Sequence, residues 1–317
     1  MADGRVSWPR GSLHGVSTAD ERPARLEVGV VGAGRVGAVL GAALQRVGHR
    51  VVAASGVSDA SRERAARLLP GIPVLDPGEV VQRAELVLLA VPDDALAGLV
   101  AGLAATQAWQ AGQLVVHTSG RHGLEVFEPA LSRHILGLAL HPAMTFTGTA
   151  VDLDRLADCC FGITAPEPLR AVAEALVLEI GSEPVWVEEA ARPMYHAALT
   201  HGSNHLVTLI AQSMQALAAA GVAIPSRVLE PLVSAALDNA LRAGDAALTG
   251  PVARGDAGTV AEHLRQLRTL TPDVRPTYVA LARATAERAL ASGRLKPHAA
   301  EPLLDILASD QEPRSTE

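Results

Sequence analysis

The sequence is poor in aromatic residues and almost free of lysine. Aromatic residues make up only 3% of the 317 residues, so any core must be built from aliphatic side chains. Lys296 is the only lysine, which excludes a lysine ammonium as a proton donor elsewhere in the chain. The net charge of −7 lacks the basic footprint of nucleic-acid-binding proteins. We therefore expect no nucleic-acid partner.

Cysteine is scarce as well. The two cysteines, Cys159 and Cys160, are adjacent in the sequence, which disfavours a disulfide between them. They also lack the spacing of metal ligands, so we predict no metal site. This cysteine usage is typical of a reducing compartment, and we expect a cytoplasmic protein.

The chain lacks a continuous hydrophobic run of membrane length. Residues 95–119 and 194–226 contain no Asp, Glu, Lys or Arg, but glutamines interrupt the first stretch and histidines the second. Both are interpreted as buried elements, and no membrane partner is expected. Residues 1–25 are polar and have no apolar central region, which predicts a flexible tail and not a secretory signal.

The clearest motif is a glycine turn between an apolar run and a helical pattern. Residues 28–31 predict a strand, and Val36, Leu40 and Leu44 have helical spacing. Between them stands a Gly-x-Gly-x-x-Gly turn, which allows a pyrophosphate to approach the start of a helix. The motif predicts a dinucleotide site, and its expected contacts are Gly32, Gly34, Arg35, Val36 and Gly37.

The end of the second predicted strand, residues 50–54, distinguishes NADP from NAD. NAD enzymes usually place a carboxylate there to hold the ribose 2′-hydroxyl. This strand instead leads into Ser55, Ser58 and Arg62, which suit a 2′-phosphate. We predict NADP as the cofactor, with NAD the less favoured choice; the alternative is that these residues only cap a helix and that Asp59 turns in.

Further strands are predicted at residues 86–91, 114–117 and 135–140, and they alternate with helices. This alternation is typical of an α/β, Rossmann-like, doubly wound and mostly parallel sheet. Ligands bind outside the carboxyl ends of such strands. The residues expected to contact the cofactor there are Val91, Pro92, Thr118 and Ser119.

No strand pattern follows Arg192, where helices are predicted at residues 192–220, 226–243, 259–270 and 276–292. The predicted organisation is a tail at 1–25, a dinucleotide-binding domain at 26–190, an all-helical domain at 191–295 and a tail at 296–317. The helical domain has more apolar surface than a small domain can bury, which predicts a homodimer.

Histidines are the main candidates for proton transfer, because lysine is absent and the ordinary pKa of histidine lies near neutrality. His141 is preferred since it ends a predicted strand. His196 and His201 on the long helix come next, with Asn204 as an orienting donor and Ser203 as a substrate contact. The alternative for His141 is that it only caps the strand end. The alternative for the polar residues of the long helix is that they form hydrogen bonds to other helices.

Residues 249–256, read as Thr-Gly-Pro-Val-Ala-Arg-Gly-Asp, form the third motif. Arg254 can clamp a substrate carboxylate or reach a cofactor phosphate. The alternative is an ion pair with Asp256 or with another helix. Asp256 is expected to cap the helix that follows.

Several short segments together resemble a known family. The segments are residues 32–37, 117–120, 140–142, 195–196, 203–205 and 249–256 with His263. The chain resembles predicted oxidoreductases that join a Rossmann-like NADP-binding domain to a C-terminal domain of unknown function. That family is similar to pyrroline-5-carboxylate reductases, prephenate dehydrogenases and ketopantoate reductases. The resemblance implies a helical domain that supplies the substrate pocket and a dimer interface. The chain lacks the long-helix lysine of ketopantoate reductases.

The leading hypothesis is an NADP-dependent oxidoreductase that reduces a small carboxylate-bearing ketone, such as a 2-oxo acid. One alternative is a cyclic-imine reductase of the pyrroline-5-carboxylate type. Another is a non-catalytic NADP-binding sensor or interaction protein. A transferase that depends on S-adenosylmethionine is the weakest alternative, because no acidic residue ends the second strand to hold the ribose of that cofactor.

Overall fold

The computed structural model describes residues 25–309, so the predicted tail at residues 1–25 lies almost entirely outside the described residues. Contacts divide the chain into two units, one ending at Leu199 and the other beginning at Thr200. This division falls inside helix α7 (Arg192–Ala219), a few residues after the boundary expected at 190/191. Within residues 25–309, no helix combines the length and apolar character needed to cross a bilayer.

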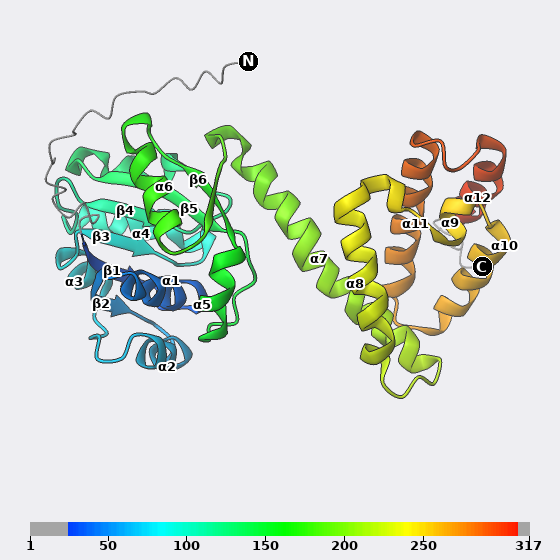
Figure 1. The fold of residues 1–317 in the computed structure, drawn as a ribbon, viewed down its shortest axis with the longest axis horizontal. Coiled ribbons are helices and arrows are strands. Elements are labelled where there is room, and N and C mark those ends of the chain that lie inside the picture. Colours follow the sequence, from blue (N-terminus) through cyan, green and yellow to red (C-terminus); the bar gives the residue numbers. More distant parts are fainter. Residues whose placement is uncertain (1–24, 310–317) are drawn as a thin grey trace, which may run out of the picture. The chain divides into compact units, whose positions relative to one another are not determined.

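The first unit is built on one seven-stranded sheet with the order β2-β1-β3-β4-β5-β6-β7 (Figure 1). Only β5 and β6 pair antiparallel, and all other neighbours are parallel. The strands are β1 (Glu27–Val31), β2 (Arg50–Ser55), β3 (Leu86–Leu89), β4 (Leu114–His117), β5 (Leu136–Pro142), β6 (Cys160–Thr164) and β7 (Glu183–Trp186). The prediction of a Rossmann-like, mostly parallel sheet is confirmed.

Helices cover both faces of this sheet, which explains the nearly continuous apolar strands. They are α1 (Arg35–Arg46), α2 (Asp59–Leu68), α3 (Pro77–Gln82), α4 (Asp93–Ala105), α5 (Val151–Arg155) and α6 (Arg170–Glu179). Between β4 and β5 the chain forms the 3-10 helix η1 (Leu124–Arg133), which contains Pro129. One core cluster joins α1 and α6 to the sheet, and a second joins α3, α4 and η1 to it.

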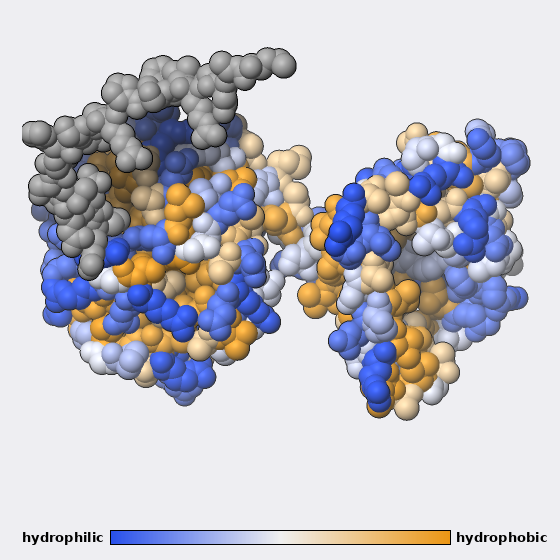
Figure 2. Space-filling view, viewed as in Figure 1, coloured by the Kyte–Doolittle hydropathy of each residue, from blue (hydrophilic) through white to orange (hydrophobic). Residues whose placement is uncertain are grey.

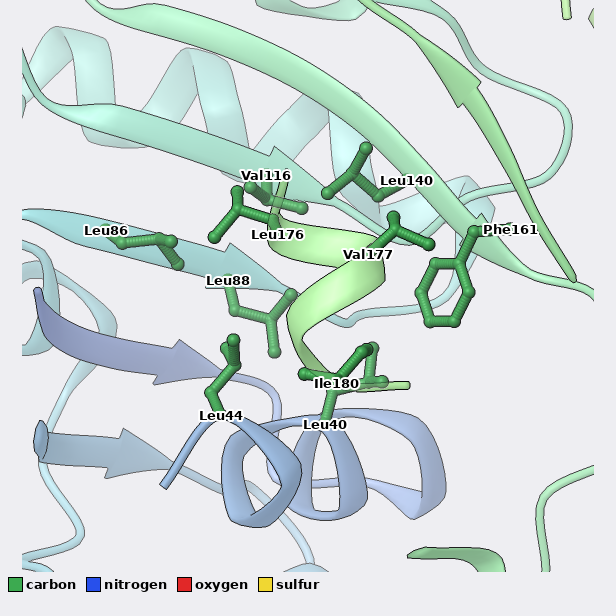
Figure 3. A pocket seen from close by; sticks show the side chains of 10 residues that line it. All are labelled: Leu40, Leu44, Leu86, Leu88, Val116, Leu140, Phe161, Leu176, Val177 and Ile180. Atoms are coloured by element: carbon green, nitrogen blue, oxygen red, sulfur yellow. The ribbon is translucent and has the colours of Figure 1, made fainter. Parts of the chain in front are cut away.

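Helices α1 and α6 lie side by side on the same face of the sheet (Figure 3). Leu40 and Leu44 of α1 meet Leu176 and Val177 of α6 above the strands. The gap between them measures about 30 Å³, which is about the volume of one water molecule. Because its lining is entirely apolar, it is a packing gap of the core and not a ligand site.

The second unit is helical and has its own core. Besides the C-terminal part of α7 it contains α8 (Pro225–Ala243), α9 (Gly250–Arg254), α10 (Ala257–Gln266), α11 (Val274–Ala291) and α12 (Pro297–Ser309). The buried apolar residues come from α9 to α12 and from Leu295. Asp256 caps α10, as predicted, because its carboxylate accepts a hydrogen bond from the Thr259 N–H.

The C-terminal segment differs from the sequence prediction. Residues 296–317 were expected as a tail, but Pro297–Ser309 forms α12. Ala300, Leu303 and Leu307 are buried, and their spacing places them on one helix face against α10 and α11. The prolines and acidic residues around this stripe obscured the pattern in the sequence.

Helix α8 is the least buried long element of the second unit. None of its 19 residues is buried, and Leu232 and Leu241 are 64% and 80% exposed. Val207 and Leu209 of α7 also expose apolar side chains. Figure 2 shows hydrophobic side chains gathered over this part of the second unit.

Candidate active site

The glycine turn after β1 needs each of its glycines for a different reason. Gly32 has a φ of +96°, and a Cβ there would lie 2.6 Å from the Ala90 carbonyl oxygen. A Cβ on Gly37 would overlap the Gly32 carbonyl oxygen. At Gly34, by contrast, the nearest atom would be 4.0 Å away. The first and third glycines therefore close the turn, and the second faces open space.

The start of α1 behind Gly34 is free to bind an anion. Gly34 is the N-cap, no side chain caps the helix, and the first turn contains no acidic residue. Free N–H groups and the helix dipole stabilise a phosphate at such a position. Arg35 is exposed there, whereas Val36 packs against the core. The turn fits the pyrophosphate of a dinucleotide.

At the tip of β2 the predicted cofactor residues make hydrogen bonds within the protein. The buried Ser55 hydroxyl accepts a hydrogen bond from the Gly32 N–H at 3.1 Å, so it holds the glycine turn. Ser58 caps α2 by accepting from the Ser61 N–H. Arg62 donates to the Gly56 carbonyl and to Asp59 at 3.1 and 2.9 Å.

The ends of β3 and β4 lie beside this turn in the sheet order. A Cβ on Gly32 would touch Val91, and Pro92 is the N-cap of α4. Thr118 is partly exposed. The buried Ser119 hydroxyl accepts hydrogen bonds from the N–H groups of Arg121 and His122, so it shapes the turn after β4.

His117, the last residue of β4, is a structural histidine. It is fully buried, its Nε2 donates to the Gly123 carbonyl at 2.9 Å, and its Nδ1 accepts from the Ser119 N–H. Burial lowers the pKa of His117 to about 3, against the smaller opposing effect of the bond to Gly123. The ring is therefore neutral and fixes the loop at residues 117–123.

Three polar rings meet at the carboxyl end of β5, where His141 is the second-to-last residue. The Tyr195 hydroxyl lies 2.9 Å from His141 Nδ1, and their rings pack edge to face. The His196 ring centroid lies 6.1 Å from that of His141. A Cβ on Gly120 would come within 2.9 Å of both His141 Nε2 and His196, so only glycine fits beneath the two histidines.

Burial keeps the His141–Tyr195 pair neutral at physiological pH. It lowers the pKa of His141 to about 4, and the charges of Arg192 and His196 lower it further. Burial also raises the pKa of Tyr195. The expectation that a histidine here titrates near neutrality is therefore wrong for His141. The pair offers hydrogen bonds and no positive charge.

Arg192, the first residue of α7, joins the strand ends around this cluster. Its side chain is fully buried, and Nε donates to the Thr164 hydroxyl at 2.8 Å. Its two Nη atoms donate to the carbonyls of Ser119, Ala139 and Gly162 at 2.9 to 3.0 Å. One guanidinium thus connects β5, β6 and the loop after β4 to α7.

Sequence reasoning assigned no role to Arg192 or Tyr195. Arg192 lies next to the predicted domain boundary at 190/191, and Tyr195 stands beside His196 only among the segments that carry the family resemblance. Their positions could have indicated a role, because both lie within four residues of His196 at the start of a helix that follows the sheet.

The remaining candidates lie in the second unit. His201, Ser203 and Asn204 are exposed on α7, and His201 Nδ1 lies 3.0 Å from His205 Nδ1. Arg254 is exposed at the end of α9, and among the described residues it makes no ion pair within 4.0 Å. The roles assigned to these residues stay predictions. Within residues 25–309, no group of three potential ligands is placed to hold a metal ion.

Two family models match the chain. Residues 14–142 match a Rossmann-like domain, and residues 159–285 match a domain of unknown function, DUF2520. No protein with a curated description matches the chain in sequence.

Solved structures share the fold over most of the chain. A candidate NADP oxidoreductase from Bacteroides fragilis is 24% identical, with a TM-score of 0.72, and the match covers 83% of this chain and 98% of that one. An imine reductase from a Pseudomonas species is 18% identical, with a TM-score of 0.62 and coverages of 90% and 100%. A pyrroline carboxylate reductase from Plasmodium falciparum with NADP bound is 11% identical, with a TM-score of 0.54 and coverages of 84% and 98%.

Proposed function

We propose that this chain, in which residues 14–142 match a Rossmann-like domain and residues 159–285 match a DUF2520 domain, is an NADP-dependent oxidoreductase. The observation that carries the proposal is the open, uncapped start of α1 behind Gly34. The neutral His141–Tyr195 pair lies at the carboxyl end of β5 in the same sheet. In this fold such an edge holds both a cofactor and its substrate.

Each part of the glycine turn has a task in holding the cofactor. The free N–H groups of α1 bind the pyrophosphate, and Ser55 keeps Gly32 in place. Val91, Pro92 and Thr118 are proposed to border the cofactor along the next strand ends. Bound NADPH supplies the hydride.

The protonation of the site favours a substrate that carries its own positive charge. Hydride transfer to a ketone leaves negative charge on oxygen, which needs a strong donor or an acid. The pKa of His141, at about 4, means that this ring carries no acidic proton to give at neutral pH. A protonated imine needs no such proton. We therefore place imine reduction ahead of ketone reduction.

Neutral His141 still has a role toward an imine. When the Tyr195 hydroxyl donates a hydrogen bond to Nδ1, the neutral imidazole carries its single N–H proton on Nε2. This nitrogen faces Gly120. That N–H can orient a carboxylate or another acceptor of the substrate. A neutral imidazole can also polarise a carbonyl, which keeps a small 2-oxo acid as the second candidate.

Helix α7 and the second unit carry further candidate substrate contacts. Arg254 suits a bidentate contact with a substrate carboxylate. Asn204 and Ser203 offer neutral hydrogen bonds, and His196 and His201 are further candidates for proton exchange.

The function is tested by a panel of cyclic imines and 2-oxo acids with saturating NADPH, followed at the nicotinamide absorbance. We expect oxidation of NADPH with at least one carboxylate-bearing cyclic imine. Oxidation only with 2-oxo acids would establish the ketone reading. If NADPH binds and no member of either class oxidises it, the catalytic proposal fails and a non-catalytic NADP-binding protein remains.

We also propose that the protein is a homodimer through α8 and the neighbouring face of α7. Leu232 and Leu241 expose large apolar side chains on a helix without a single buried residue. Light scattering at micromolar concentration should give twice the mass of the chain. A Leu232→Glu/Leu241→Glu double variant should give the monomer mass, whereas a wild type of monomer mass would reject the proposal.

A further inference from the structure

Two arginine side chains meet at one glycine in the loop between β5 and α5. Gly148 has a φ of +78°, and a Cβ there would lie 2.5 Å from Arg64 Nε and 3.0 Å from Arg35 Cγ. Arg35 begins α1, and Arg64 lies on α2. A glycine is needed because the loop packs directly onto both side chains.

The loop is held in this position by a buried carboxylate. Asp152 is fully buried, and it accepts hydrogen bonds from the N–H groups of Thr147 and Gly148 at 2.8 and 2.7 Å. It also accepts from the Thr147 hydroxyl at 2.9 Å. These hydrogen bonds therefore fix the loop in the position in which Gly148 packs on the two arginine side chains.

The Arg64 side chain has an unsatisfied donor beside Gly148. Among the described residues, the buried Arg64 Nε has no hydrogen-bond partner. Within residues 25–309, neither Arg35 nor Arg64 pairs with a carboxylate, although Arg62 on the same helix pairs with Asp59. A buried donor without a partner, on a side chain that packs with a second arginine against one glycine, is an environment that a bound anion satisfies.

We propose that Arg64, together with Arg35, binds the 2′-phosphate of NADP(H). This assignment rests on the proposed function. Arg64 belongs to the helix that follows β2, whose tip faces the adenosine ribose in this fold. Arg62 neutralises Asp59, the one carboxylate at the start of α2, and leaves the phosphate to Arg64.

The test compares NADPH with NADH on an Arg64→Met variant, by titration of the nicotinamide fluorescence. NADPH affinity should fall by about 10- to 100-fold, because a charge-assisted contact to the 2′-phosphate is lost. NADH affinity should stay within about twofold, and adenosine 2′-monophosphate should lose affinity in parallel with NADPH. Arg67→Met, which removes the same charge from an exposed position on α2, should leave all three affinities unchanged.

Several outcomes would overturn the assignment. Equal losses for NADPH and NADH would place Arg64 at the pyrophosphate or make it structural. Wild-type affinities in Arg64→Met, or a loss of NADPH preference only in Arg62→Met, would also reject it. If Arg64→Met does not fold, Gly148→Ala offers a second variant, since its Cβ displaces Arg64 and should lower NADPH affinity alone. A wild type that binds no nucleotide would refute the proposed function itself.

Discussion

The strand ends of the first unit and the α7–α8 surface of the second differ in which side chains they bury. The strand ends bury polar groups, and the α7–α8 surface exposes apolar ones. Around β4 to β6, His117 and Arg192 are buried, and each has its hydrogen-bond partners. On α8, apolar side chains such as Leu241 are exposed, and the helix buries none of its residues. The first region is preorganised within one chain. The second has the character of a surface that another molecule covers.

Replacing Arg192 should have the largest effect, because it removes the residue that joins the preorganised strand ends. Arg192→Met leaves three carbonyls and a hydroxyl without their donor in a buried site. We expect a loss of roughly 3–5 kcal/mol in the free energy of unfolding, as for other broken buried charge networks. Urea unfolding measures it. Arg67→Met serves as the control and should change stability by less than about 0.5 kcal/mol.

Replacing His141 tests whether this residue contributes to turnover or only to the stability of the same region. His141→Ala should lower turnover of an imine by about 10- to 100-fold, the expected cost of one lost hydrogen bond to a charged group. The Kd for NADPH should not change. Tyr195→Phe should have a smaller effect, because it removes only the partner of Nδ1. Turnover unchanged in His141→Ala would make the ring structural.

The pH dependence of turnover follows from the same ring. Since the pKa of His141 is about 4, its neutral form persists from pH 8 down to about pH 5. Titration of His141 should therefore cause no inflection in the wild-type kcat profile near pH 6.5. Any inflection present there should persist in His141→Ala. An inflection that disappears in His141→Ala would contradict the neutral assignment.

Acid should also weaken the first unit. The folded-state pKa values of His117 and His141, about 3 and about 4, lie below the ordinary 6.5. The unfolded chain thus binds more protons than the folded chain between pH 6.5 and about 4, and stability falls as the pH falls through that window. Each histidine contributes at most about 1.4 kcal/mol per pH unit. Urea unfolding from pH 7.5 to 4.5 should show a shallower slope in His117→Asn, and an unchanged slope would count against this account.

The sequence was informative wherever one local pattern determines one local structure. The glycine spacing predicted the turn at residues 32–37, and the alternation of apolar runs with helical patterns predicted the sheet. Asp256 was predicted as a cap because capping needs only a neighbour three residues away.

The residues that sequence analysis missed act through distant contacts. Arg192 reaches Ser119, which lies 73 residues earlier, and Arg64 meets Gly148 only because the β5–α5 loop returns to α2. No local spacing encodes such a pairing. Likewise the low pKa of His141 comes from burial and from Arg192, and both exist only in the folded protein.

The most direct test of the central claim, that NADP(H) binds at the glycine turn, is an NADPH titration of wild type and Gly34→Ala. Gly34 has a φ of −69°, and an added Cβ meets no protein atom closer than 4.0 Å, so thermal stability should not change. The same methyl group occupies the space where a pyrophosphate approaches α1. We therefore expect NADPH affinity to fall by at least about tenfold with an unchanged melting temperature. Equal NADPH affinity in wild type and Gly34→Ala would contradict the account.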